Sequence, residues 1–139
     1  MNEGYQTFDH TGDLGLEVWA ETPERLHALA AEALLAQSVE ARSAEPEVRL
    51  SLSLTGDEPV DLLVHWLNTA LLKAETEHAV WTRVQVHALT PRSIEATLEG
   101  PRLDPGRDVR LREIKAVTRH ALVLELEPPG CRCRLVLDI

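Results

Sequence analysis

The 139-residue sequence contains no apolar run long enough to cross a membrane. Its apolar stretch without a charged side chain, Leu62 to Leu72, is well short of the roughly 20 apolar residues that a transmembrane helix needs. A basic segment followed by an apolar one, the pattern of a secretory leader, does not open the chain either. We therefore expect a cytoplasmic protein with no membrane association.

Cysteine is scarce, and the two cysteines, Cys131 and Cys133, are two residues apart. On a strand they would share one face and lie about 6.6–7 Å apart, which is at or beyond the limit for a disulfide. A zinc site would need further ligands at finger-like spacing, and the sequence offers none. Since free cysteine prefers protein cores, we expect two buried, reduced thiols.

Basic side chains are also few: 14 bases stand against 23 acids, which gives a formal net charge of −9. This charge excludes unaided, non-specific binding of RNA or DNA, because phosphates would be repelled. If the function of this chain involves nucleic acid, we expect the contact to be made through a partner protein. Only Lys73 and Lys115 are lysines; the other bases are arginines.

The first half of the chain alternates between strand and helix patterns. Every second residue is apolar from Leu14 to Ala20, which predicts a half-buried strand with residues 5–8 as its hairpin partner. Thr22 and Pro23 begin a predicted amphipathic helix over residues 23–38. A second strand follows over residues 48–54, and Asp57 is expected to cap a second amphipathic helix over residues 59–77.

The second half consists of strand patterns, which cover residues 80–89, 93–99, 121–127 and 131–137. Residues 100–112, rich in charge and proline, predict a loop between them. Together the elements predict a single domain over residues 1–139 of the α+β class. We expect a two-layer sandwich in which two amphipathic helices pack on a mixed, mostly antiparallel β-sheet.

The polar segment from Asp9 to Asp13 has two interpretations. Asp and Gly are common in hairpin turns, so the segment can be a turn and nothing more. Two carboxylates, the imidazole of His10 and a hydroxyl within five residues also suit a polar binding site.

The last strand pattern continues almost to the end of the sequence and places Asp138 and Ile139 at an ordered strand end. Asp138 and the terminal carboxylate put two negative charges on adjacent residues. If Asp13 lies nearby, three carboxylates converge, and a proton or a cation must relieve their repulsion. Oxygen ligands select hard cations such as Mg²⁺, Ca²⁺ or Mn²⁺. A solvated strand end is the simpler interpretation of the same residues.

The segment from Glu113 to His120 places Lys115 between apolar residues just before a strand pattern. A lysine in such a position is more often a solvated or snorkelling side chain than a functional one. His120 is equally compatible with a histidine at a sheet edge.

The sequence resembles a known family, the archeases, which are small activators of the GTP-dependent RNA ligase that seals tRNA halves. The features that carry the resemblance span nearly the whole chain in the family's order: the opening from Asp9 to Gly15, its continuation Trp19-Ala20-x-Thr22, the helix Leu63–Leu72, the segment Glu113–His120 and the ending Asp138-Ile139. Two positions depart from the family, which usually has Ala in place of Gly12 and often an aromatic residue in place of Arg119.

The resemblance implies that Asp13, Asp138 and the terminal carboxylate of Ile139 bind a divalent metal ion, Ca²⁺, Mg²⁺ or Mn²⁺. It also implies that Lys115, with His10 and His120 as further candidates, contacts the ligase or its nucleotide. The implied activity is not catalysis. The chain would act as a chaperone-like cofactor of tRNA splicing, which promotes guanylylation of the ligase and its multiple turnover and reaches RNA only through the ligase.

Two other functions remain open from the residues alone. A metal-dependent phosphoester hydrolase would use Asp13, Asp138, His10 and His120, although the sequence shows neither a nucleophile with its base nor a Gly-rich phosphate loop. A general chaperone that modulates nucleic-acid-processing proteins would need a large exposed apolar patch, whereas the predicted helices direct their apolar faces to the core.

Overall fold

The computed structural model describes residues 2–127 and 129–139, so Met1 and Pro128 of the predicted domain lie outside the described residues. The elements follow one another in this order: β1 (Gly4–His10), β2 (Asp13–Ala20), α1 (Pro23–Ser38), β3 (Val39–Glu40), β4 (Val48–Thr55), α2 (Pro59–Glu77), β5 (Arg83–Thr90), β6 (Ser93–Gly100), β7 (Val109–Arg110), β8 (Ala116–Val117), β9 (Val123–Glu125) and β10 (Cys131–Asp138).

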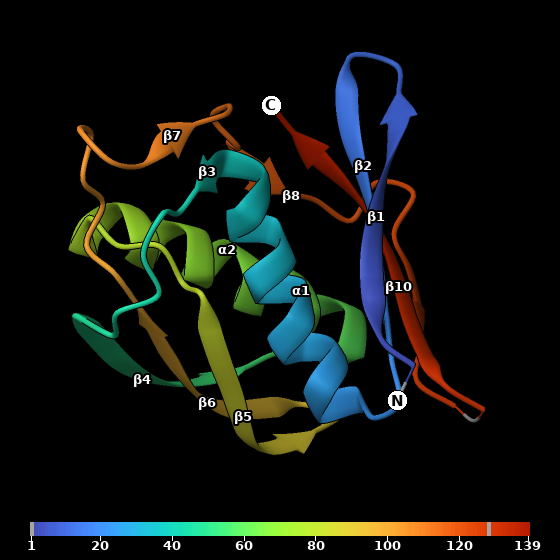
Figure 1. Cartoon of the computed structure of the whole chain (residues 1–139). Helices are drawn as coiled ribbons and strands as arrows, with labels where there is room; N and C mark the ends of the chain where they lie inside the picture. Colours follow the sequence, from blue (N-terminus) through green and yellow to red (C-terminus); the bar gives the residue numbers. More distant parts are fainter. Residues whose placement is uncertain (1, 128) are drawn as a thin grey trace.

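The strands divide into three sheets. Five strands form one sheet in the order β1-β2-β10-β8, in which β9 also pairs with β10. Three strands form a second sheet in the order β4-β6-β5, and β3 and β7 form a third. Every pairing between the described strands is antiparallel. The predicted α+β class is confirmed, while the single sheet of the prediction is replaced by separate sheets on different sides of the helices (Figure 1).

The burial of α1 explains this division. The helix contacts β2 of the five-stranded sheet and β5 of the three-stranded sheet, so it lies between them (Figure 1). Besides the predicted apolar stripe, it buries Ala28, Ala31 and Leu35 on other sides. Small alanine side chains let strands approach the helix from two directions. The predicted start is confirmed: the hydroxyl of Thr22 accepts a hydrogen bond from the Arg25 main-chain N–H at 3.1 Å.

Helix α2 packs against α1, β4 and β8. It begins after Glu58 rather than after Asp57, and the Glu58 side chain makes no capping hydrogen bond. The prediction that Asp57 caps this helix is therefore wrong, because Glu58 occupies the capping position and its main-chain oxygen accepts the Leu62 N–H at 2.9 Å. The helix ends at Glu77, and the residue that caps it, His78, adopts the left-handed conformation with φ of 51°.

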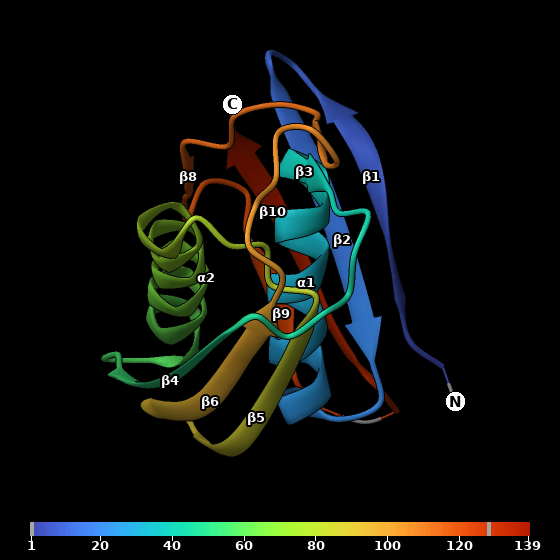
Figure 2. The same ribbon diagram turned by 60° about the vertical axis from the view of Figure 1, so that its left-hand side comes forward.

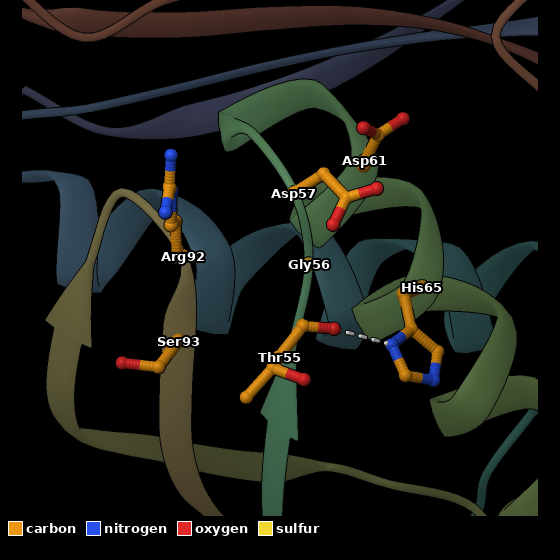
Figure 3. A pocket seen from close by; sticks show the side chains of 7 residues that line it. All are labelled: Thr55, Gly56, Asp57, Asp61, His65, Arg92 and Ser93. Atoms are coloured by element: carbon orange, nitrogen blue, oxygen red, sulfur yellow. Dashed lines mark hydrogen bonds between the residues drawn. The ribbon is translucent and has the colours of Figure 1, made fainter.

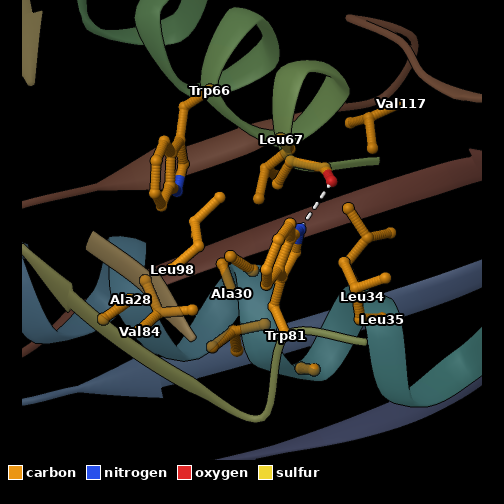
Figure 4. Packing of buried hydrophobic residues seen from close by; sticks show 14 of the residues in the cluster. Ala28, Ala30, Leu34, Leu35, Trp66, Leu67, Trp81, Val84, Leu98 and Val117 are labelled. Carbon is orange, nitrogen blue, oxygen red and sulfur yellow. Dashed lines mark hydrogen bonds between the residues drawn. The ribbon is translucent and has the colours of Figure 1, made fainter. Parts of the chain in front are cut away.

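Two tryptophans fill the centre of the core (Figure 4). The indole N–H of Trp66 donates to the main-chain oxygen of His27, and that of Trp81 donates to Ala70, both at 2.9 Å. Each large ring is therefore buried without leaving its polar nitrogen unpaired. The two bonds tie α2 to α1 and to the segment before β5.

Predicted strand boundaries differ from the structure, most of them by one or two residues and some by more. Strand β5 begins at Arg83 rather than residue 80, and the N–H groups of Val80 and Thr82 bond to Pro101 and Glu99. Strand β9 covers only Val123–Glu125 because Ala121 has φ of 53°, outside the extended region. The predicted loop over residues 100–112 contains the short strand β7.

Both cysteines are free and buried on β10, as predicted. Burial raises the pKa of the Cys133 thiol to about 12. None of the described helices is long and apolar enough to cross a membrane.

Candidate functional site

Three neighbouring strands end together at one end of the five-stranded sheet. His10, the last residue of β1, pairs with Asp13, the first residue of β2, across a tight turn in which Gly12 has φ of 75°. On the other side of β2, Leu137 pairs with Leu14, so the same register brings Asp138 beside Asp13. Figures 1 and 2 both show the C-terminus at the same end of the molecule as the β1–β2 turn.

Two imidazoles and a carboxylate meet at this end. Nδ1 of His10 lies 3.8 Å from Oδ2 of Asp13, which is too far for a hydrogen bond. That nitrogen is buried and has no hydrogen-bond partner within the described part of the chain. The ring of His120 approaches edge-on, with ring centroids 5.8 Å apart and an interplanar angle of 81°.

The segment that carries Lys115 lies against the end of β10. The main-chain N–H of Lys115 donates to the main-chain oxygen of Asp138 at 2.7 Å, and the next residue, Ala116, pairs with Asp138 in the sheet. The Lys115 side chain is exposed. The fold thus brings residues predicted from three distant parts of the sequence to one end. These residues are His10 and Asp13 of the first hairpin, Lys115 and His120, and Asp138.

Asp13 and Asp138 offer carboxylate oxygens, the type of donor that a hard divalent cation prefers. Within residues 2–127 and 129–139, neither Asp13 nor Asp138 forms an ion pair with a lysine or arginine. Those same residues contain no group of three His, Cys, Asp or Glu side chains close enough to hold a metal ion. The third ligand would have to be the main-chain carboxylate of Ile139, whose oxygen atoms are of the same chemical type.

The sequence reasoning missed two contacts that anchor the Lys115 segment to α2. The side-chain amide of Asn68 donates to the main-chain oxygen of Val117 and accepts from its N–H, both at 2.8 Å. The guanidinium of Arg119 pairs with Asp61 and, at 2.9 Å, with Glu58. A polar residue inside the apolar pattern of α2 was the available signal for Asn68, but no sequence pattern links it to a residue 49 positions away.

A pocket of about 620 Å³ lies at the start of α2 (Figure 3), and its lining contains none of the predicted site residues. Its lining consists of Thr55, Gly56, Asp57, Asp61, His65, Arg92 and Ser93. Nδ1 of His65 is hydrogen-bonded to the Thr55 carbonyl at 2.9 Å. Asp61 links this pocket to the Lys115 segment through Arg119.

Curated proteins similar to this chain are archeases. The archease of Methanopyrus kandleri is 29% identical over 138 residues, which cover 97% of this chain and 99% of the relative. The archease of Methanosarcina mazei is 30% identical over 139 residues, which cover 97% and 95% of the two chains.

Two solved structures share the fold of this chain. The solution structure of protein 1598 of Methanobacterium thermoautotrophicum is 25% identical and superimposes with a TM-score of 0.80 over 98% of this chain and 99% of that one. The crystal structure of a Thermotoga maritima archease, described as a possible chaperone, is 19% identical and shares the fold with a TM-score of 0.66 over 96% of each chain. The model of the archease protein family matches residues 5–139, and this chain therefore belongs to the archease family.

Proposed function

We propose that this protein activates the GTP-dependent tRNA-splicing RNA ligase by promoting guanylylation of the ligase and its multiple turnover, and that it has no catalytic activity of its own. The observation that carries the proposal is the strand register that gathers Asp13, Asp138 and Lys115 at one end of the five-stranded sheet. Membership of the archease family supports it.

A divalent cation, Ca²⁺, Mg²⁺ or Mn²⁺, would be held by Asp13, Asp138 and the terminal carboxylate of Ile139. The all-oxygen donor set and the absence of a lysine or arginine partner for either aspartate among the described residues support this assignment. When bound, the cation supplies positive charge that neutralises phosphate oxygens during transfer of GMP.

Lys115 is the residue that we assign to contact with the ligase or its nucleotide. Its side chain is exposed and its main chain is bonded to Asp138, so its ammonium group starts from a fixed point beside the proposed metal ligands. His10 and His120 meet edge-on at the same end and form the rim of the contact. An ammonium group that reaches a phosphate stabilises the charge that develops there.

The acidic character of the chain suits this partner. A protein with net charge −9 is attracted to a basic, RNA-binding ligase, and such attraction raises the association rate. RNA is then reached only through the ligase.

Formation of the ligase–GMP adduct tests the proposal, with this protein present in substoichiometric amounts. Wild-type protein is expected to increase the rate and to act repeatedly. Asp13→Asn and Asp138→Asn are expected to reduce the stimulation about 10-fold or more, as loss of a metal ligand or its support commonly does. Asp9→Asn, in the same hairpin but at an exposed position paired with Leu14, is the matched control and keeps full stimulation.

Two further assays separate this function from the alternatives. Turnover of phosphoesters by the protein alone with Mn²⁺ would support a hydrolase and contradict the activator role. Suppressed aggregation of unrelated client proteins would support a general chaperone. The large apolar side chains exposed in the described residues are Tyr5, Leu72, Val109, Leu111 and Ile139. No observation shows that they form the single large apolar patch that such a chaperone would need.

A further inference from the structure

Strand β8 has only two residues, yet it supports the Lys115 segment. One edge of β8 pairs with Leu137 and Asp138 at the end of β10. Helix α2 lies on its other side (Figure 2). A strand this short makes few main-chain hydrogen bonds, so its position depends on what holds its second edge.

Asn68 of α2 holds that edge. Its side-chain amide donates one hydrogen bond to the Val117 oxygen and accepts one from the Val117 N–H, both at 2.8 Å. A carboxamide carries a donor and an acceptor side by side, as a peptide group does, so Asn68 takes the place of a neighbouring strand. These bonds are partly buried, and a buried main-chain group that loses its partner is costly.

The second anchor of the segment has a weaker hold. Arg119 pairs with Asp61 and Glu58, but the Arg119 side chain is 54% exposed. Exposed ion pairs contribute little, because water screens them and two long side chains must be ordered. Asn68 is therefore the contact that decides where the segment lies.

We propose that Asn68 is a positioning residue for ligase activation: its amide fixes β8 against the end of β10 and so keeps Lys115 beside Asp138. This inference rests on the proposed function, in which Lys115 acts on the ligase. The path has two steps, from Asn68 to Val117 and from the main chain of Lys115, two residues earlier, to Asp138.

The test compares Asn68→Ala, Lys115→Ala and the double variant with the wild-type protein. Thr76→Ala is the matched control, since Thr76 is also a polar residue of α2 but its hydroxyl donates to the Leu72 oxygen of its own helix. The rate of ligase–GMP formation is measured against activator concentration, which separates the plateau from the half-saturating concentration. Hydrogen exchange at the Lys115 and Val117 amides is measured on the protein alone.

Asn68→Ala is expected to speed exchange of these two amides about tenfold or more and to lower the plateau, with the half-saturating concentration unchanged. In the Lys115→Ala background it is expected to lower the plateau no further, because both changes remove the same contact. A merely structural role would instead reduce the amount of folded activator, which raises the half-saturating concentration and leaves the plateau intact.

Each contrary result has a distinct meaning. Unchanged exchange at Lys115 and Val117, an intact plateau, or a plateau loss that adds to that of Lys115→Ala would each overturn the positioning role while the activator function stands. A wild-type protein that does not stimulate the ligase would refute the proposed function and this inference with it.

Discussion

Replacing Gly100 by alanine is expected to destabilise the fold by about 2–4 kcal/mol, although the same change elsewhere commonly stabilises a protein. Gly100 ends β6, and a Cβ atom there would lie 1.6 Å from the main-chain oxygen of Val80 and 2.7 Å from its carbonyl carbon. Real Cβ atoms essentially never come within 3.0 Å of such atoms. The contact cannot be relieved by a side-chain rotation, because both neighbours are main chain.

The magnitude follows from what must move. Val80 would have to retreat by roughly 1.4 Å from Gly100, a displacement that forfeits close packing on both sides. Its N–H bond to Pro101 and the neighbouring bond from Thr82 to Glu99, both 3.0 Å long, would be strained or lost, at about 1 kcal/mol each. Overpacking adds about 1–3 kcal/mol. Loss of chain freedom in the unfolded state offsets only about 0.4–1 kcal/mol, so destabilisation wins.

Urea denaturation followed by tryptophan fluorescence measures this effect, since Trp81 lies next to Val80 and is 1% exposed. Gly106→Ala is the matched control: its Cβ would meet only a side-chain oxygen of Asp104, at 3.4 Å, and the unfolding free energy is expected to change by less than about 1 kcal/mol. If Gly100→Ala unfolds at the wild-type urea concentration or above it, the close approach of β6 to the Val80 main chain is refuted.

Three further predictions concern ionisable groups. Cys133, with a pKa raised to about 12 by burial, is expected to react with a thiol reagent at pH 8 at a negligible rate until the protein is unfolded, and fast labelling of the native state would contradict this. The Arg107 guanidinium and, to a smaller extent, two main-chain N–H donors lower the pKa of Asp108 below its unfolded value near 3.8. The ionised carboxylate therefore stabilises the fold fully above about pH 4, and this contribution is lost as the pH falls through the folded-state pKa. Urea midpoints at pH 7 and pH 3 should therefore show that Asp108→Asn loses more stability relative to wild type at pH 7 than at pH 3, and an equal loss at both pH values would contradict this. Arg119→Ala is expected to cost less than about 1 kcal/mol in thermal unfolding, because its ion pairs are exposed, and a larger loss would show that they are worth more than surface pairs usually are.

The local elements of the fold could be predicted because their signals are local. The hydroxyl of Thr22, the ring of Pro23 and the apolar spacing that follows determine α1 within one stretch of chain, and the structure has the helix over the predicted residues. The number of sheets could not be predicted in this way. It depends on which sides of α1 are buried, and alanines such as Ala28 and Ala31 are compatible with either an exposed or a buried face.

The acidic end of the candidate site was visible in the sequence for a similar reason. A strand pattern that continues to Leu137 fixes where Asp138 lies along its strand, and the turn before Asp13 fixes the start of β2. What the pattern could not supply was the pairing of these two strands. The structure provides this pairing: β10 lies antiparallel to β2 in a register that places Asp138 beside Asp13.

The contact between Asn68 and Val117 belongs to a different class, because it joins a side chain to the main chain across elements far apart in sequence. A side-chain amide can bond to any exposed peptide group, so the sequence of α2 carries no information about the partner of Asn68. The structure assigns that partner to Val117, and the assignment gives a helix of the core a direct hold on the candidate site. A change in the packing of α2 would therefore be transmitted to Lys115 through Asn68 and β8.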